Sequence, residues 1–334
     1  MDPRVKPGDD ELGSRMAQGN FAILEERGIL AVSGADRRLF LQGLVSNDVE
    51  KLAANRGVYA ALLTAQGKYL HDFTMVEEGE AIWLDAEAAR LGDLRRRLAI
   101  YRLRAKVEIA ERPELAVAVV FGEGALAALG LSDEPGEARP LDGGVVLVDP
   151  RLAKLGARII MDRRRLARFG SELTQVDFAA WDRHRLALGI PDGSRDLVPD
   201  KSILLEAGFD ELHGVDWGKG CYVGQELTAR TKYRGLIKKR LFPVHIEGPA
   251  PAPGTMVTAE GRDAGEVRSS RDGQGLALLR LDAVGAGRKL VADAATLLPI
   301  RPDWMRVEGV DAPHPPTPDG AGPSLSPLAG RGPG

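Results

Sequence analysis

The pattern of apolar residues changes character after Arg240. Beyond this residue, short apolar runs follow one another at close spacing, with turn-forming clusters such as Glu260-Gly261-Arg262-Asp263 and Arg271-Asp272-Gly273 between them. Short runs of this kind, separated by turns, are typical of antiparallel strands, and we predict a small β-barrel. The expected strands are 241–247, 256–259, 265–269, 276–280 and 290–292.

Before Arg240, strands and helices are mixed. Residues 21–32 resemble a strand pair around a turn at 25–28, and 59–64 with 70–76 predict a hairpin. The other expected strands are 81–84, 107–111, 115–121, 145–149 and 157–161, and the expected helices are 36–44, 86–98, 123–129 and 178–188. Mixed elements first and a compact β module last predict an α+β fold.

Composition limits the classes of function. The chain has 334 residues, enough for two or three domains, and its net charge of −3 gives no reason to expect nucleic-acid binding. The longest apolar run, Leu115 to Phe121, is too short to span a bilayer, and no apolar signal segment is evident at the N-terminus. We therefore expect a cytoplasmic protein without a membrane partner. The Pro- and Gly-containing ends, 1–20 and 304–334, are expected to be disordered.

The chain has a single cysteine, Cys221, in the octapeptide Lys219-Gly220-Cys221-Tyr222-Val223-Gly224-Gln225-Glu226. A thiol near a lysine and ahead of a helix that begins at Gln225 ionises more readily, and thiolate is both nucleophile and metal ligand. The alternative is a small buried apolar residue in a tight turn. An iron–sulfur cluster usually needs several thiolates, so Cys221 could supply only one ligand, at a shared interface. No histidine pair has metal-site spacing, and we predict no conventional metal site.

The octapeptide resembles the K-G-C-Y-x-G-Q-E signature of the YgfZ family. Members of that family are folate-binding proteins of iron–sulfur cluster assembly and repair, related in fold to the aminomethyltransferase (T-protein) of the glycine cleavage system. Further segments that resemble the family are 39–49, 60–68, 102–107 and 204–208. The resemblance implies an aminomethyltransferase-like fold of three domains around a central opening. The implied domains are a discontinuous folate-binding domain at 21–108 and 185–240, a second α+β domain at 109–184, and the barrel at 241–303.

The resemblance also implies a function and a set of site residues. We expect a tetrahydrofolate-dependent accessory factor whose partners are iron–sulfur enzymes or cluster carriers, acting through Cys221 with Lys219 beside it. Glu206 is expected to hold the pterin ring, because a carboxylate accepts hydrogen bonds from its amino group. The other expected folate-site residues are Asn47, Asp48, Tyr101, Gln225, Glu226 and Arg230.

Several alternatives stay open. Asn47 and Asp48 also suit a turn after a helix, and Tyr59 and Tyr101 suit core packing. Arg230 to Arg240 is rich in cations, which could lie on a solvated face, bind folate carboxylates or, as a weaker alternative, bind RNA as a tRNA-modification auxiliary. A folate-dependent aminomethyl transferase is a further alternative. However, His71 stands where aminomethyltransferases carry the first of two aspartates, and we expect His71 and Asp72 to be unrelated, half-exposed residues.

Overall fold

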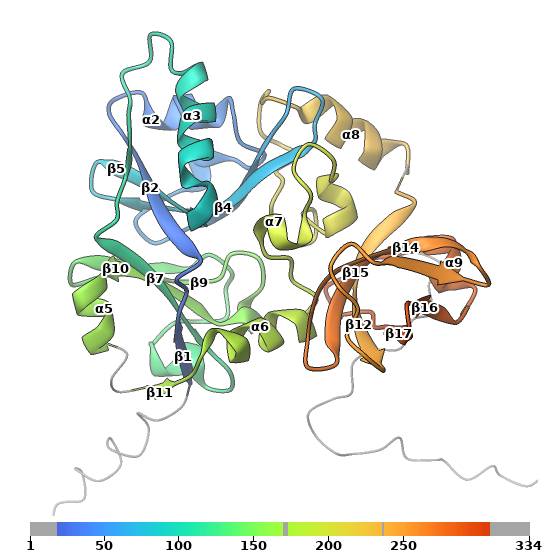
Figure 1. Cartoon of the computed structure of the whole chain (residues 1–334). Helices are drawn as coiled ribbons and strands as arrows, with labels where there is room; N and C mark the ends of the chain where they lie inside the picture. Colours follow the sequence, from blue (N-terminus) through green and yellow to red (C-terminus); the bar gives the residue numbers. More distant parts are fainter. Residues whose placement is uncertain (1–18, 170–172, 236, 308–334) are drawn as a thin grey trace, which may run out of the picture.

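The computed structural model describes residues 19–169, 173–235 and 237–307. Two sheets of mainly antiparallel strands stand one above the other, and a closed barrel lies beside the lower sheet (Figure 1). The expected α+β class, with a C-terminal barrel, is confirmed.

The upper sheet has five strands in the order β3-β4-β5-β2-β6. The strands are β2 (Arg27–Ser33), β3 (Val58–Leu63), β4 (Tyr69–Glu78), β5 (Ala81–Glu87) and β6 (Glu108–Glu111). Helices α2 (Arg37–Gln42) and α3 (Leu91–Tyr101) pack apolar side chains such as Leu41, Leu94 and Leu98 against this sheet. The predicted hairpin is confirmed, since β3 and β4 pair antiparallel.

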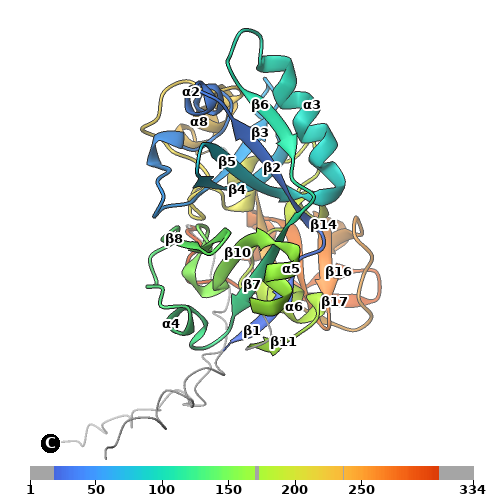
Figure 2. The ribbon, with the colours of Figure 1, turned by 90° about the vertical axis from the view of Figure 1, so that its left-hand side faces the viewer.

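The lower sheet has six strands in the order β11-β1-β7-β10-β9-β8 (Figure 2). They are β1 (Asn20–Ile23), β7 (Leu115–Phe121), β8 (Ala138–Leu141), β9 (Gly144–Val148), β10 (Ala157–Asp162) and β11 (Thr174–Gln175). The associated helices are α4 (Ala125–Ala128), α5 (Arg163–Phe169) and α6 (Phe178–Ala187). The strand β7 is buried along its whole length, which explains its continuous apolar run.

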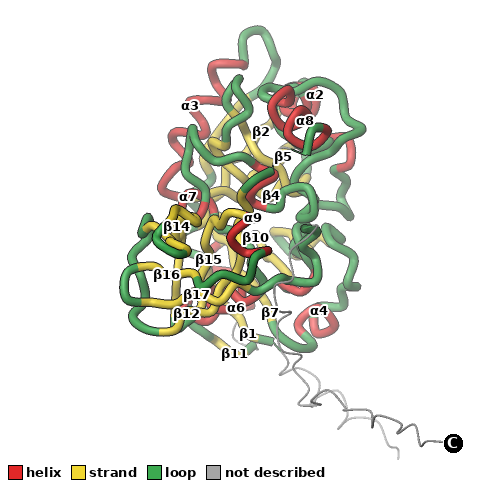
Figure 3. Tube along the Cα trace, turned by 90° about the vertical axis from the view of Figure 1, so that its right-hand side faces the viewer, coloured by secondary structure: helices red, strands yellow, loops and turns green. Residues whose placement is uncertain are grey.

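The C-terminal strands close in the order β12-β15-β14-β13-β16-β17. They are β12 (Lys239–Glu247), β13 (Met256–Ala259), β14 (Arg262–Arg271), β15 (Gln274–Arg280), β16 (Leu290–Ala292) and β17 (Ala295–Pro299), with helix α9 (Leu281–Gly285) after β15. Alternate residues such as Phe242, Val244 and Ile246 point into the barrel core. Figure 3 shows the barrel beside α6, and its β14 also contacts α7 (Gly193–Asp196).

Buried ion pairs connect the two sheets. Asp85 on β5 accepts hydrogen bonds from Arg27 Nε at 2.7 Å and from Arg158 on β10 at 2.7 Å. Arg158 and Arg151 both bind Asp149, and although burial acts to raise the pKa of this carboxyl, the two guanidinium groups lower it to about 2. Removing one partner would leave a buried charge unpaired, so this network holds the two sheets in one relative position.

The structure corrects several expectations. The two strands at 21–32 do not pair with each other, because β1 pairs with β7 in the lower sheet while β2 pairs with β5 in the upper one. Likewise β6, which lies at the expected domain boundary at 108, pairs with β2. Residues 304–307 are described and not a tail, since Met305 is buried in the barrel core. The remainder of both expected tails, 1–18 and 308–334, lies outside the described residues.

Candidate signature-loop site

The octapeptide forms a loop that runs into the first residues of α8 (Gln225–Tyr233), with Gly220 and Cys221 exposed and most of its other residues half-buried. Asp216 orders the start of the loop, because its Oδ1 accepts the backbone N–H groups of Gly218 at 2.6 Å and Lys219 at 2.8 Å. The Tyr222 N–H donates to Gln225 Oε1 at 3.1 Å. Cys221 lies between these two turns with its side chain exposed. The interpretation of Cys221 as a buried apolar residue is therefore wrong.

The Lys219 ammonium group fixes the loop to the end of α2 and the segment that follows it. Its Nζ donates hydrogen bonds to the carbonyl oxygens of Gln42, Val45 and Asn47 at 2.9, 2.6 and 2.8 Å. An ammonium group has three donors and no acceptor, so these three carbonyls use its whole capacity. Burial lowers the pKa of Lys219 to about 8, against the opposing charges of Asp48 and Asp216. None of its hydrogen bonds goes to Cys221, so Lys219 is placed as an anchor of the loop.

Of the two glycines that flank the thiol, only Gly224 is required by its position. It has a φ of +83°, and a Cβ there would lie 2.4 Å from the Thr64 carbonyl oxygen and 2.9 Å from Leu63 Cβ. Gly67 of the β3–β4 turn faces it, with a φ of +76°. A Cβ on Gly220 meets nothing within 4 Å. The second signature glycine therefore packs the loop against the hairpin.

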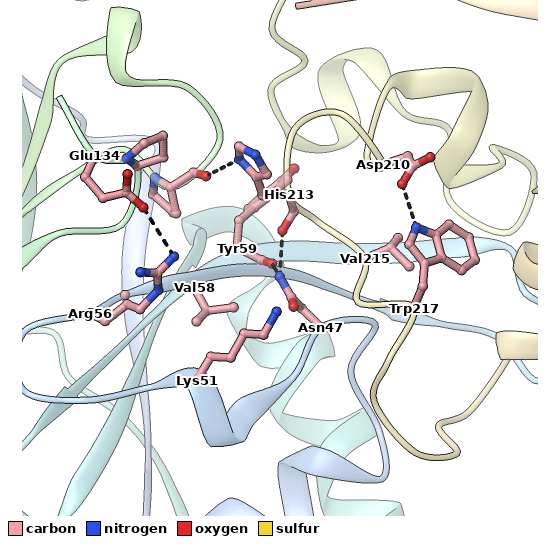
Figure 4. Close-up of a pocket in the computed structure, with 13 residues that line it drawn as sticks. Asn47, Lys51, Arg56, Val58, Tyr59, Glu134, Asp210, His213, Val215 and Trp217 are labelled. Carbon is pink, nitrogen blue, oxygen red and sulfur yellow. Dashed lines mark hydrogen bonds and ion pairs between the residues drawn. The ribbon is translucent and has the colours of Figure 1, made fainter. Parts of the chain in front are cut away.

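Two adjoining hollows lie beside the loop. A pocket of about 340 Å³ is lined by Asn47, Tyr59, His213 and Trp217 among others (Figure 4). A wider groove of about 830 Å³ is lined by Trp217, Lys219, Tyr222, Gln225 and Glu226 together with Arg230 and Tyr233. Trp217 lines both the pocket and the groove.

Trp217 is held firmly between the two hollows. Its Nε1 donates to Asp210 Oδ1 at 2.6 Å, as Figure 4 shows, and Lys232 Nζ lies 4.2 Å from the centre of its ring. Lys232 also binds Asp210 Oδ2 at 2.7 Å. The indole therefore presents a flat, fixed wall, as a planar heterocycle requires. Trp217 is not among the predicted site residues, although an aromatic residue two positions before the signature lysine is a signal present in the sequence.

The structure separates the residues expected to bind folate. Asn47 lines the smaller pocket, but its Nδ2 is committed to the carbonyls of Tyr59 at 2.8 Å and His213 at 2.6 Å. Asp48 caps the short 3-10 helix Val49–Lys51 and accepts Gln42 Nε2 at 2.7 Å, which confirms the turn alternative. Tyr101 ends α3 with 41% of its surface exposed and lines neither hollow. The exposure of Tyr101 contradicts the alternative of core packing, and its place in a folate site stays a prediction.

Glu206 lies outside the two hollows beside the signature loop. It is on the 3-10 helix Leu204–Ala207, which contacts β12 of the barrel. Burial raises the pKa of its carboxyl, and the charges of Lys68, Lys239 and Arg268 act in the opposite direction. Its carboxylate makes no hydrogen bond to the described residues. Glu206 lines neither the pocket nor the groove.

His71 and Asp72 are both buried, which corrects the expectation that they are half-exposed. They point to opposite faces of β4, as expected for neighbours on a strand. His71 Nε2 lies 2.9 Å from Asp93 on α3, and burial together with the charge of Arg90 lowers its pKa to about 4. Asp72 accepts the hydroxyl groups of Tyr59 at 2.8 Å and Tyr69 at 2.7 Å.

The cations after the signature do not form one surface. Arg240 is buried and binds Glu211 and the Leu205 carbonyl oxygen. Lys232 is paired with Asp210, and Lys239 lies 3.8 Å from Asp263. Arg230, Arg234 and Lys238 are exposed, so the cations of 230–240 are divided between ion pairs, the interior and the surface.

Within the described part of the chain, no three His, Cys, Asp or Glu residues are grouped so that they could hold a metal ion. Among the same residues, no helix is both long and apolar enough to cross a membrane.

Solved structures define the class of fold. The aminomethyltransferase T of the glycine cleavage system from Bartonella henselae matches with a TM-score of 0.70, covering 90% of both chains at 17% identity. The family model for the CAF17 C-terminal beta-barrel domain matches residues 238–307. The molecule therefore has an aminomethyltransferase-like fold with a CAF17-type barrel.

Curated relatives define the family. The iron–sulfur cluster assembly factor IBA57 of Mus musculus is 33% identical, covering 88% of both chains, and that of Homo sapiens is 34% identical, covering 84% of both. The chain belongs to the IBA57 family of iron–sulfur cluster assembly factors. This agrees with the broad expectation of an iron–sulfur assembly family with this fold.

The expected cytoplasmic location is contradicted by these relatives. The mouse and human relatives and six fungal ones are all named as mitochondrial proteins. The lack of an apolar signal segment does not distinguish cytoplasmic from mitochondrial proteins, because mitochondrial targeting segments are amphipathic rather than apolar.

Proposed function

We propose that this protein is an accessory factor for the assembly or repair of iron–sulfur clusters, acting through Cys221 and depending on tetrahydrofolate. The observation that carries the proposal is the exposed thiol in a loop that Lys219 and Gly224 fix against the upper sheet. The names of the related IBA57 proteins support the same process. The signature also supports a closer relation to YgfZ.

In this proposal the cluster is the cargo. Cys221 supplies one thiolate to a cluster intermediate, and the partner protein supplies the remaining ligands, because one thiol cannot hold a cluster alone. The fixed loop reduces the conformational entropy that is lost when the partner binds. The partners are iron–sulfur enzymes or cluster carriers.

The folate proposal has two candidate places. Glu206 offers a carboxylate without a hydrogen bond to described residues, with Lys68 and Lys239 near enough to act on its charge, so pterin and glutamate groups would both find partners. The smaller pocket offers the Trp217 indole as a stacking wall, with Lys51 and Arg56 at its rim. We favour Glu206, with the pocket as the competing location.

Aminomethyl transfer is the less supported alternative. Asp72 is held by two tyrosine hydroxyl groups and His71 by Asp93, so neither side chain is free to take part in chemistry on a folate. The protein therefore has the fold of an aminomethyltransferase but lacks a free carboxylate at this position for the transfer reaction.

The first test measures a [4Fe–4S] enzyme in cells that lack the gene and carry either wild-type protein or Cys221→Ala. We expect rescue by the wild type alone, with equal amounts of both proteins in the cells. Equal rescue by both proteins would support the role in iron–sulfur assembly but show that Cys221 is not needed for it. No deficit in the deletion cells would contradict the assembly role.

Folate dependence is tested by calorimetric titration with tetrahydrofolate. We expect Glu206→Gln to weaken binding by about tenfold, the value of one charge-assisted hydrogen bond, while Trp217→Ala stays near wild type. The opposite result would place the ligand in the Trp217 pocket. Absence of binding to the wild type would remove folate from the proposal.

A further inference from the structure

An unexplained apolar surface lies at the free end of the upper sheet. Of the large apolar side chains that are exposed in the described residues, Leu39, Ile100 and Leu103 have exposed fractions of 76%, 68% and 88%. Leu39 is on α2, Ile100 is in the last turn of α3, and Leu103 is in the turn that follows. Figure 1 shows this turn as the outermost part of that end of the molecule.

Hydrogen bonds bring the two parts of the surface together. Asp36, the residue before α2, donates its N–H to the Lys106 carbonyl oxygen at 3.4 Å and accepts the Lys106 N–H on Oδ2 at 2.7 Å. Gly34 has a φ of +105°, and a Cβ there would lie 2.2 Å from the Lys106 carbonyl oxygen. The turn after α3 is therefore packed against the start of α2.

The cations of this turn are not neutralised. Arg102, Arg104 and Lys106 are exposed and have no ion-pair partner among the described residues. The arginines of α3 itself differ, because Arg96 and Arg97 both bind Asp93. Unpaired cations around exposed apolar groups fit a partner surface that is acidic and apolar.

The same surface leads directly to the thiol. Leu39 is three residues after Asp36 and four before Gly43, so helical spacing puts all three on one side of α2. The Gly43 carbonyl oxygen accepts the N–H of Val223, two residues after Cys221. The rise of a helix from Asp36 to Gly43 is about 10 Å. A protein seated on Leu39 and Leu103 would therefore also reach the signature loop.

We propose that Leu39, Ile100, Leu103, Arg102, Arg104 and Lys106 form the docking surface for an acidic iron–sulfur protein that exchanges a cluster at Cys221. The inference rests on the proposed assembly function and specifies its partner. A lipid surface would gain nothing from the nearby thiol, and aliphatic side chains give nucleic-acid bases no stacking platform. The surface supplies apolar contact area, and its cations select the charge of the partner.

The test places a photoreactive benzoylphenylalanine at position 103 in cells, with position 256 as the matched control. Met256 is also an exposed apolar residue, at 59%, but lies on the barrel. We expect an adduct at 103 with an acidic iron–sulfur protein, identified by mass spectrometry, that is weaker at 256. Arg102→Glu with Arg104→Glu should reduce it about tenfold. Equal adducts at both positions, or adducts only with lipid, RNA or a second copy, would overturn the proposal.

The charge-reversed protein separates docking from assembly. It should restore the [4Fe–4S] enzyme about tenfold less well than wild type, yet melt within about 2 °C of it, because both arginines are exposed. Alkylation of Cys221 in the purified variant should proceed at the wild-type rate. If wild type rescues and the variant rescues equally, docking is wrong and the assembly role stands. If wild type fails to rescue, the assembly role itself is wrong.

Discussion

The C-terminal barrel and the signature loop are held in place by different forces. The barrel closes around apolar side chains, among them Phe242, Val257 and Leu279, which have no exposed surface. The loop depends on a few polar contacts, chiefly the Lys219 ammonium group and the Asp216 carboxylate. The barrel core is made by many residues and tolerates changes that conserve volume, whereas a loop geometry set by a few hydrogen bonds can be lost with one side chain. Three changes test this contrast, and a further one, at His71, tests a buried side chain of the upper sheet.

The largest effect is expected in the barrel. Phe242→Ala removes a fully buried ring, and such changes cost about 3 to 5 kcal/mol of the free energy of unfolding. Urea denaturation measures the loss, with Phe242→Leu as a control that refills most of the space. A loss below about 1 kcal/mol would mean that the barrel core relaxes readily.

The second change compares the two signature glycines. Gly224→Ala combines a left-handed backbone with a clash against the Thr64 carbonyl oxygen, and should cost about 2 to 4 kcal/mol. Gly220→Ala meets nothing and should change stability by less than about 0.5 kcal/mol. Thermal melting of both proteins checks the pair, and equal melting temperatures would contradict the packing of Gly224 on the hairpin.

The third prediction concerns how the free energy of unfolding depends on pH through His71. The folded protein lowers its pKa from 6.5 to about 4, so the fold favours the neutral ring. The stabilisation is complete above pH 6.5 and is lost as the pH falls towards 4. Between pH 7 and pH 5 the free energy of unfolding should fall by about 2 kcal/mol from this group. The drop should be smaller by that amount in His71→Gln, and an unchanged drop would assign the pH dependence to other groups.

The smallest effect on stability is expected at the Lys219 anchor. Lys219→Met keeps the apolar stem but loses three hydrogen bonds while avoiding the cost of burying a charge, so the net loss should be about 1 kcal/mol. Hydrogen exchange should nevertheless become faster in the peptide 216–224 and stay unchanged in 256–271 of the barrel. Lys219→Arg should restore protection only in part, because the three carbonyls converge on a single tetrahedral nitrogen and a planar guanidinium group does not match that arrangement. Unchanged exchange in the loop would show that Lys219 is not its anchor.

Much of the fold could be predicted from the sequence. The barrel strands 256–259 and 290–292 were located at their observed ends, and the hairpin of β3 and β4 was found, because periodic burial and turn residues are local signals. Strand β17 and helix α5 were missed. The pairing of β1 with β7 was also missed, because strand order depends on contacts between distant residues, which local patterns do not encode.

The candidate site divides in the same way. The importance of the octapeptide and, through its signature, the kind of family could be predicted from the sequence alone, because both depend on residue identity and order. The folded structure was needed to show that Lys219 contacts carbonyls at and after the end of α2, that Trp217 separates two hollows, and that Tyr101 lines neither of them. It also joined Asp36, at the start of the helix that carries Leu39, to Lys106 in the turn that carries Leu103, seventy positions later in the chain. Hydrogen-bond partners and solvent exposure are properties of the packed chain, and no single segment contains them.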